Sequence, residues 1–230
     1  MSHDDPTNGP TNGPTRWTQV DEFLESHYAA ADAEQARVLA AQRSADMPDI
    51  EVSAMHARLL AVLARSIGAQ TVVEFGTLGG YSTLHLARAL PPNGRVITHE
   101  RDERHADVAR ASLDAAGVGH KVTIRVGTAL DTLPVLADDA PVDLTFIDAD
   151  KPNNTNYFEA AVAISRRGAL IVIDNVVRDG DIADAGNDDP KVAGSRAVVE
   201  HVAKDSRVEA TVIQTVGRKG YDGMLIATVL

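Results

Sequence analysis

Two apolar runs in this sequence each end in side chains that carry oxygen. The run TFI is followed by Asp148, and the run LIVI is followed by Asp174 and Asn175. If these runs are neighbouring parallel strands, their carboxyl ends meet at one edge of a sheet and the three side chains converge there. Two carboxylates and one amide oxygen suit Mg²⁺ or Ca²⁺ rather than zinc. Alternatively, each Asp caps the helix or loop that follows it.

A lysine stands three residues after the first of these carboxylates. Beside a divalent cation, the ammonium group of Lys151 is destabilised relative to the neutral amine, which can accept a proton as a general base. The alternative is an exposed Lys151 that forms an ion pair with Asp150. Residue type and spacing do not choose between the two.

A glycine-rich turn, EFGTLGGYS, follows the first predicted strand, from Glu74 to Ser82. It either lets a ligand approach the backbone at a helix N-terminus or is a tight turn without a ligand. The dinucleotide pattern G-x-G-x-x-G would need glycine at two positions, where Leu78 and Tyr81 stand. Glu100 lies about 20 residues beyond the turn, where a carboxylate can bind ribose hydroxyls or simply open the next helix. Together these features favour a nucleoside without phosphates, such as S-adenosylmethionine.

The composition narrows the function further. The chain has 230 residues, 33 Asp and Glu against 22 Lys and Arg, a net charge of -11 and no Cys. Such a chain forms no disulfides or Cys-ligated metal sites, and its charge repels nucleic acid and anionic lipid, so neither is an expected partner. The longest segment without a charged side chain, 75–87, is shorter than the roughly 20 residues of a membrane span. A cytoplasmic location is expected.

Apolar, β-branched runs alternate with alanine-rich helical patterns after Gly68. Seven segments are predicted to be strands: 71–75, 95–98, 122–126, 142–147, 169–173, 208–213 and 224–229. Helices are predicted from Ser53 and over 82–90, 102–116, 154–166 and 195–204. This alternation predicts an α/β fold with a doubly wound, mostly parallel seven-stranded sheet and helices on both faces. The last link is too short for a crossover helix, so the last strand is expected to be antiparallel.

The N-terminus differs from the rest in composition. Residues 1–16 contain the repeat PTNGPTNGPT, whose Pro and Gly content predicts a disordered tail. Residues 17–230 are then a single domain, with N-terminal helices in 17–50 and the catalytic core in 51–230.

A family resemblance is carried by the segments VVEFGTLGGYSTLHLARALP, VITHERD, VGTALDTLP, FIDADK, IVIDNVV and QTVGRKGYDG. They resemble the cation-dependent class I O-methyltransferases, the group of catechol and caffeoyl-CoA O-methyltransferases, over roughly residues 50–230. The resemblance implies a Rossmann-like methyltransferase fold, S-adenosylmethionine, a divalent cation (Mg²⁺, with Ca²⁺ or Mn²⁺ as alternatives) and a homodimer. The implied reaction methylates one hydroxyl of a vicinal dihydroxy aromatic, catechol-like substrate.

The resemblance also implies roles for the matching residues. The cofactor-binding residues would be Val52, Glu74, Gly76, Thr77, Ser82, Glu100, Ala129 and Asp148. Within this set, Ser82 would hold the methionine carboxylate, Glu100 would bind the ribose hydroxyls, and Ala129 would approach the adenine through its backbone. The metal ligands would be Asp148, Asp174 and Asn175, and Lys151 would be the catalytic base.

Three residues depart from the family pattern. His56 stands where Gln or Glu is usual, Thr128 where Asp is common and Asn154 where Tyr is common. None of them is at a metal or base position, but they leave the natural substrate unidentified. The acidic loop 178–191 is predicted to be a mobile lid.

Two other functions are compatible with the predicted topology. An NAD(P)-dependent oxidoreductase would use the same kind of sheet, but Leu78 and Tyr81 break its fingerprint. A non-catalytic protein that only binds S-adenosylmethionine would have no use for Lys151 or for three metal-type ligands.

Overall fold

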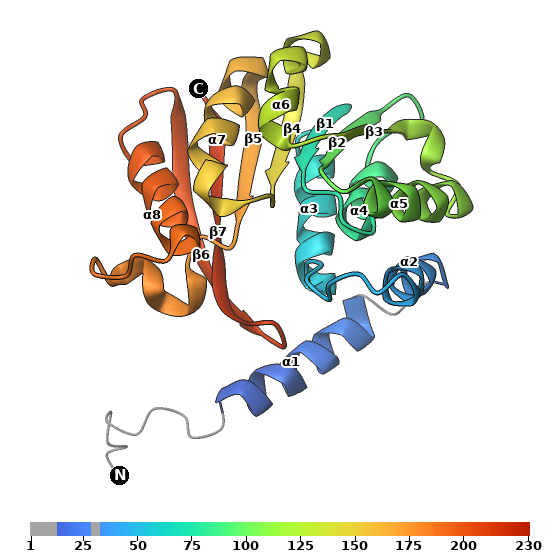
Figure 1. Ribbon diagram of the computed structural model, residues 1–230, viewed down its shortest axis with the longest axis horizontal. Coiled ribbons are helices and arrows are strands. Elements are labelled where there is room, and N and C mark those ends of the chain that lie inside the picture. The colour runs from blue at the N-terminus through green and yellow to red at the C-terminus, as the bar shows by residue number, and fades with distance from the viewer. Residues whose placement is uncertain (1–12, 29–32) are drawn as a thin grey trace.

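The computed structural model describes residues 13–28 and 33–230 and contains a seven-stranded sheet between two layers of helices (Figure 1). The strands are β1 (Thr71–Phe75), β2 (Arg95–Glu100), β3 (Val122–Val126), β4 (Val142–Ile147), β5 (Ser165–Asp174), β6 (Val208–Gly217) and β7 (Gly220–Val229). Their order is β3-β2-β1-β4-β5-β7-β6. β1 to β5 are parallel, and β7 runs antiparallel to both β5 and β6. The predicted fold class is confirmed.

Helices cover both faces of this sheet because successive side chains of a strand point to opposite sides. The α-helices are α1 (Gly13–Tyr28), α2 (Ala33–Ser44), α3 (Ala54–Ser66), α4 (Tyr81–Ala89), α5 (Glu103–Ala115), α6 (Ala129–Thr132), α7 (Asn154–Ile164) and α8 (Pro190–Val202). Short 3₁₀ helices are η1 (Gly119–Lys121), η2 (Leu133–Asp139), η3 (Lys151–Asn153) and η4 (Arg178–Ala183). Val72 of β1 belongs to the buried cluster that includes residues of α3, α4 and α5, whereas Val73 belongs to the cluster with α7 and α8.

Several element boundaries differ from the prediction: β6 ends four residues later and β7 begins four residues earlier, and the starts of β5 and α8 also differ. β5 begins at Ser165, four residues early, because Arg166 Nε donates to Asp143 Oδ1 at 2.5 Å and holds the chain against β4. α8 begins at Pro190 rather than at 195, because Asp189 caps it by accepting from Lys191 N at 2.7 Å. The predicted loop 178–191 therefore includes η4 and the start of α8, and its role as a lid stays a prediction.

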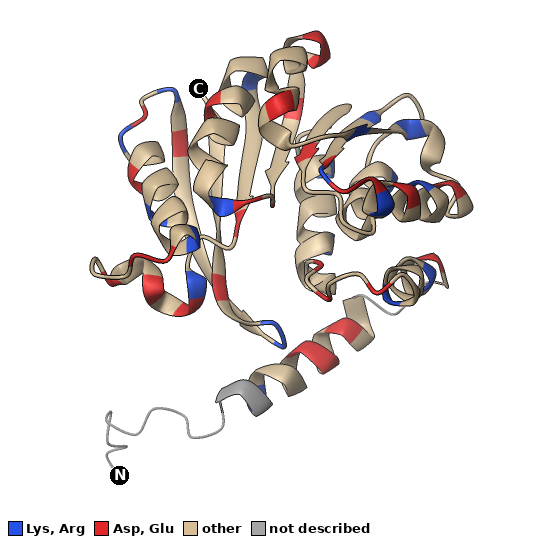
Figure 2. Ribbon diagram, in the orientation of Figure 1, with Lys and Arg blue, Asp and Glu red and all other residues tan. Residues whose placement is uncertain are grey.

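The first helix begins earlier in the chain than expected. α1 starts at Gly13, so residues 13–16 of the predicted disordered tail are helical, while residues 1–12 lie outside the described part of the chain. α1 lies beside the β6–β7 hairpin tip, and Figure 2 shows basic residues at this tip next to acidic residues of α1. Among the described residues, no helix is long and apolar enough to cross a membrane.

Candidate active site

The glycine-rich turn connects β1 to α4 and lies against the end of β4. Gly76 has φ +103°, and a Cβ there would lie 2.5 Å from the backbone oxygen of Asp148, so only glycine fits. Asp148 N in turn donates to Phe75 O at 2.8 Å. Gly80, also in the left-handed region, precedes α4 and has no side chain to cap it. The turn thus packs Gly76 against Asp148 and ends at the N-terminus of α4, whose free N–H groups can bind an anionic group.

Glu74 lies at the base of this turn and is completely buried. Its Oε2 accepts hydrogen bonds from the hydroxyls of Thr83 at 2.5 Å and Thr98 at 2.7 Å, whereas Oε1 has no hydrogen-bond partner in the described structure. Burial raises the pKa of Glu74 to about 7, and the nearby hydroxyls of Ser82, Thr83 and Thr98 lower it less than burial raises it. An orphaned buried oxygen of this kind is suited to a ligand that donates a hydrogen bond.

Glu100 ends β2 on the other side of the turn and is also buried. One carboxylate oxygen accepts from Leu78 N at 2.8 Å, and the other accepts from Asp102 N at 3.0 Å. Leu78 has φ +49°, an unusual value for a residue with a side chain, and its N–H is aimed at the carboxylate. Glu100 is therefore fixed in orientation, and each oxygen keeps a lone pair for a hydroxyl of a ligand.

The remaining predicted cofactor residues surround the same region of the fold. Ser82 is buried in the first turn of α4, and Val52 is buried immediately before α3. Thr77 is buried, with its hydroxyl 2.6 Å from that of Thr98. Ala129 is buried at the start of α6, which begins after the β3 strand end.

The predicted metal and base residues converge at the carboxyl edge of the sheet. Ile147 pairs with Ile173 in parallel register, so Asp148, just after β4, and Asp174, the last residue of β5, stand at matching positions. Lys151 is buried, and its Nζ donates to Asp148 Oδ1 at 2.7 Å. The alternative of an exposed Lys151 paired with Asp150 is therefore wrong.

Electrostatics at this edge favour a positively charged ligand. Asp174 is only 3% exposed. Burial and the negative charge of Asp148 raise the pKa of Asp174 to about 7, although Lys151 and the backbone N–H of Asn175 act in the opposite direction. Asn175 follows with φ +58°, a conformation that Asn tolerates better than most residues, and its backbone oxygen accepts from Ser195 Oγ at 3.1 Å.

Helix α8 supports the lysine, and the sequence did not indicate this contact. A Cβ on Gly194 would lie 2.3 Å from the backbone oxygen of Lys151, so glycine allows α8 to pack directly on η3. The predicted helix 195–204 left Gly194 outside; a helix that began at Pro190 would have included this glycine, and a glycine inside a helix can have a packing reason.

Asp222 of β7 is a second residue that the sequence did not indicate. Its Oδ1 accepts from the backbone N–H groups of Val177 at 3.0 Å and Arg178 at 2.9 Å. These bonds fix the segment that follows the predicted metal ligands. His56 lies in the first turn of α3, where burial lowers its pKa against the opposing charges of Asp21, Asp222 and Asp148. These charges place His56 near the acidic edge of the sheet.

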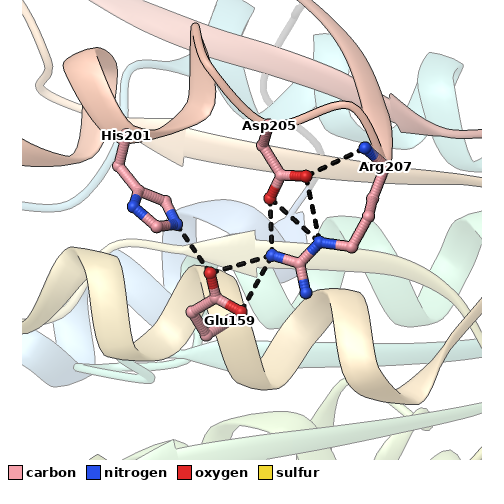
Figure 3. Close-up of polar contacts among 4 residues, drawn as sticks. All are labelled: Glu159, His201, Asp205 and Arg207. Carbon is pink, nitrogen blue, oxygen red and sulfur yellow. Dashed lines mark hydrogen bonds and ion pairs between the residues drawn. The ribbon is translucent and has the colours of Figure 1, made fainter.

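A different cluster, of two carboxylates and a histidine, lies near the start of β6, at the end of the sheet opposite the carboxyl ends of the parallel strands. Figure 3 shows its side chains. Glu159, His201 and Asp205 bring potential ligand atoms within 4.8 Å of one another. Arg207 lies between the two carboxylates, 2.8 Å from Glu159 Oε1 and 2.9 Å from Asp205 Oδ1. Its guanidinium already bonds to both carboxylates, so this cluster is an ion-pair network that joins α7 and α8 to the start of β6.

Comparison with known proteins identifies the family. The family model described as O-methyltransferase matches residues 25–228. The chain belongs to this family. A catechol O-methyltransferase of Mycobacterium tuberculosis is 49% identical, covering 91% of this chain and 94% of its own. A catechol O-methyltransferase of Niastella koreensis is 48% identical, covering 80% of this chain and 85% of its own.

Solved structures of similar proteins agree with this assignment. An O-methyltransferase from Bacillus cereus in complex with SAH has a TM-score of 0.92 and 43% identity, covering 94% of this chain and 100% of its own. The O-methyltransferase TomG from Streptomyces achromogenes, in complex with SAM, has a TM-score of 0.90 and 45% identity, covering 94% of this chain and 98% of its own. The predicted family and enzyme class, an S-adenosylmethionine-dependent O-methyltransferase, are confirmed. The oxidoreductase and the non-catalytic binder are set aside. The roles of individual site residues stay predictions.

Proposed function

We propose that this methyltransferase transfers the methyl group of S-adenosylmethionine to one hydroxyl of a vicinal dihydroxy aromatic, catechol-like substrate, assisted by a divalent cation. Mg²⁺ is the first candidate, and Ca²⁺ or Mn²⁺ are the alternatives. The observation that carries the proposal is the convergence of Asp148, Lys151 and Asp174 beside the glycine-rich turn. The names of the two catechol O-methyltransferases and the SAM and SAH of the solved relatives support the substrate class and the cofactor.

The donor set fits a divalent cation. The site has two neighbouring carboxylates, one of them almost fully buried, and only one ammonium group, that of Lys151. This leaves an excess of negative charge, which is costly in a buried site unless a cation offsets it. Asp148, Asp174 and the side-chain oxygen of Asn175 would hold such an ion, because hard oxygen ligands suit Mg²⁺ and Ca²⁺. When bound, the cation would supply Lewis acidity that favours the ionised form of the reacting hydroxyl.

Lys151 would take the proton of that hydroxyl, for which its nitrogen must be the neutral amine. It is buried beside Asp148, and the close packing of α8 at Gly194 restricts its backbone. The substrate oxygen bonds to the methyl carbon while the carbon–sulfur bond breaks and its electron pair stays on sulfur. Holding substrate and cofactor in place would lower the barrier, because oxygen, carbon and sulfur must be collinear at near-attack distance.

The cofactor would lie along the turn and the ends of β1, β2 and β3. Glu100 would bind the ribose hydroxyls with a carboxylate already oriented by two backbone N–H groups. Ser82 would hold the methionine carboxylate at the N-terminus of α4. Contacts along the rest of the cofactor would come from Val52, Glu74, the backbone of Gly76 and Thr77, the backbone of Ala129, and Asp148.

We also propose that the protein is a homodimer. Val20 and Phe23 on α1 are exposed, as are Val212, Ile213 and Val216 on β6, which is an edge strand. Exposed apolar side chains on an edge strand favour association with another copy. A solution mass equal to one chain would contradict the dimer.

Methyl transfer to catechol tests the proposed reaction. S-adenosylhomocysteine formation should stop in excess EDTA and return with Mg²⁺. Asp148→Asn should lower kcat/KM by about 100-fold or more, whereas the same change at exposed Asp107 of α5 should alter it by less than about twofold. Full activity of the wild-type protein in excess EDTA would exclude the metal role.

A further inference from the structure

The segment that leads into α3 is held by two side chains from distant parts of the chain. Gln42 of α2 donates through Nε2 to Pro48 O at 2.9 Å and to Glu51 Oε2 at 2.8 Å. Lys219, at the tip of the β6–β7 hairpin, donates to Asp49 O at 3.2 Å and to Glu51 Oε1 at 2.9 Å. Each carboxylate oxygen of Glu51 thus accepts from one of the two side chains.

Gln42 also contacts the glycine-rich turn. It is only 2% exposed, and a Cβ on Gly79 would lie 2.6 Å from its Oε1. The orientation of the amide follows from its partners, since both groups near Nε2 are acceptors. Oε1 therefore faces Gly79, and glycine at that position is what allows α2 to lie on the turn. Gln42 connects the turn to the segment before α3.

The hairpin tip connects the same segment to α1. Arg218 donates from its backbone N to Asp21 Oδ2 at 2.6 Å and from its guanidinium to Glu25 Oε2 at 3.0 Å. Figure 2 shows this basic tip beside the acidic helix α1. The tip belongs to the segment QTVGRKGYDG, and its Arg218 and Lys219 have no part in the proposed chemistry.

Glu51 is the centre of this arrangement. Its side chain is 10% exposed. Burial opposes its ionisation, but hydrogen bonds from Lys219, the backbone and Gln42 hold the pKa of Glu51 below its usual range. The next residue, Val52, is buried, and Ser53 then caps α3 by accepting from His56 N at 3.3 Å. Val52 is thereby fixed on both sides.

We propose that Gln42, Glu51 and Lys219 form a clamp that positions Val52 and the glycine-rich turn around the bound cofactor. This inference rests on the proposed contact of Val52 with the cofactor. The three residues are positioning residues: they touch the elements that hold the cofactor rather than the cofactor itself. Through the clamp, the hairpin tip and α2 set the affinity of the enzyme for S-adenosylmethionine.

Calorimetric titration of the whole protein with S-adenosylhomocysteine tests the clamp. Lys219→Met removes the donor and should weaken binding about fivefold, because it frees one side of Glu51. Lys219→Arg keeps a cationic donor and should stay within twofold of wild type. The matched control is Lys204→Met at an exposed lysine after α8, which should leave the affinity unchanged.

A second measurement separates the clamp from a simple loss of stability. The clamp predicts that Lys219→Met raises KM for S-adenosylmethionine while KM for catechol stays within about twofold. Glu51→Gln should weaken binding similarly, and the double variant should be no weaker than the worse single variant, since both remove one interaction. Unchanged affinity in both folded single variants, with only a lower Tm, would overturn the clamp. Absence of S-adenosylhomocysteine binding by the wild-type protein would instead overturn the proposed function.

Discussion

The completely buried carboxylate of Glu74 makes a prediction in which the effect of one substitution changes sign with pH. Glu74→Gln keeps the shape of the side chain and an oxygen that can accept from Thr83 and Thr98. It removes the charge, which burial disfavours. We expect the variant to be more stable than wild type at pH 8 and less stable near pH 4, while it binds the cofactor more weakly.

The magnitude follows from the pKa of Glu74, which burial raises from 4.5 to about 7. Because the folded state binds more protons than the unfolded state between these values, wild-type stability falls as pH rises from about 4.5 to 7. The pKa of Glu74 differs by about 2.5 between the unfolded and folded states, and each pKa unit corresponds to roughly 1.4 kcal/mol. Ionisation of Glu74 therefore lowers the unfolding free energy of the wild-type protein by about 3 kcal/mol at pH 8. The new amide NH₂ takes the place of the unpartnered Oε1 and costs about 1–2 kcal/mol at every pH. The net gain at pH 8 is therefore about 1–2 kcal/mol, or roughly 2–8 °C in Tm.

Urea unfolding of protein free of metal and cofactor, at pH 4.5, 6, 7 and 8, measures this effect. Glu209→Gln, on the exposed edge strand β6, is the matched control and should show the same pH dependence as wild type. The quantity to compare is the difference in unfolding free energy between each variant and wild type. A difference for Glu74→Gln that does not vary with pH would refute the argument from burial.

Three glycines give further predictions. Gly76→Ala should destabilise the protein by about 3 kcal/mol or more in urea unfolding, because its Cβ would lie 2.5 Å from Asp148 O. Gly117→Ala, also at positive φ but with no atom within 4 Å, should cost only about 1 kcal/mol, and equal losses at the two sites would contradict the steric argument. Gly194→Ala should push the backbone of Lys151 and lower kcat about tenfold or more with little change in S-adenosylhomocysteine affinity. An unchanged kcat would show that α8 does not position the lysine.

Much of the fold could be predicted because local patterns and long-range packing agree in the sheet. The runs TFI and LIVI are continuous and apolar, as strands buried on both faces must be, and polar residues end them. Once β4 and β5 are neighbours, parallel register alone sets Asp148 beside Asp174. The prediction failed at the N-terminal edges of elements, such as Ser165, where a contact from Arg166 to Asp143 extends the strand.

The sequence by itself determined the succession of strands and helices along the chain, the glycine-rich turn and the residues at the strand ends. Each of these features depends on a few adjacent side chains. It could not choose between a Lys151 that acts as a base beside a cation and an exposed Lys151 paired with Asp150, since residue type and spacing fit both. Only the tertiary structure decided that pairing, and only it brought Gln42 and Lys219 to opposite oxygens of Glu51. Such contacts join residues as far as 168 positions apart. They arise from how whole elements pack, which no local pattern of residues specifies.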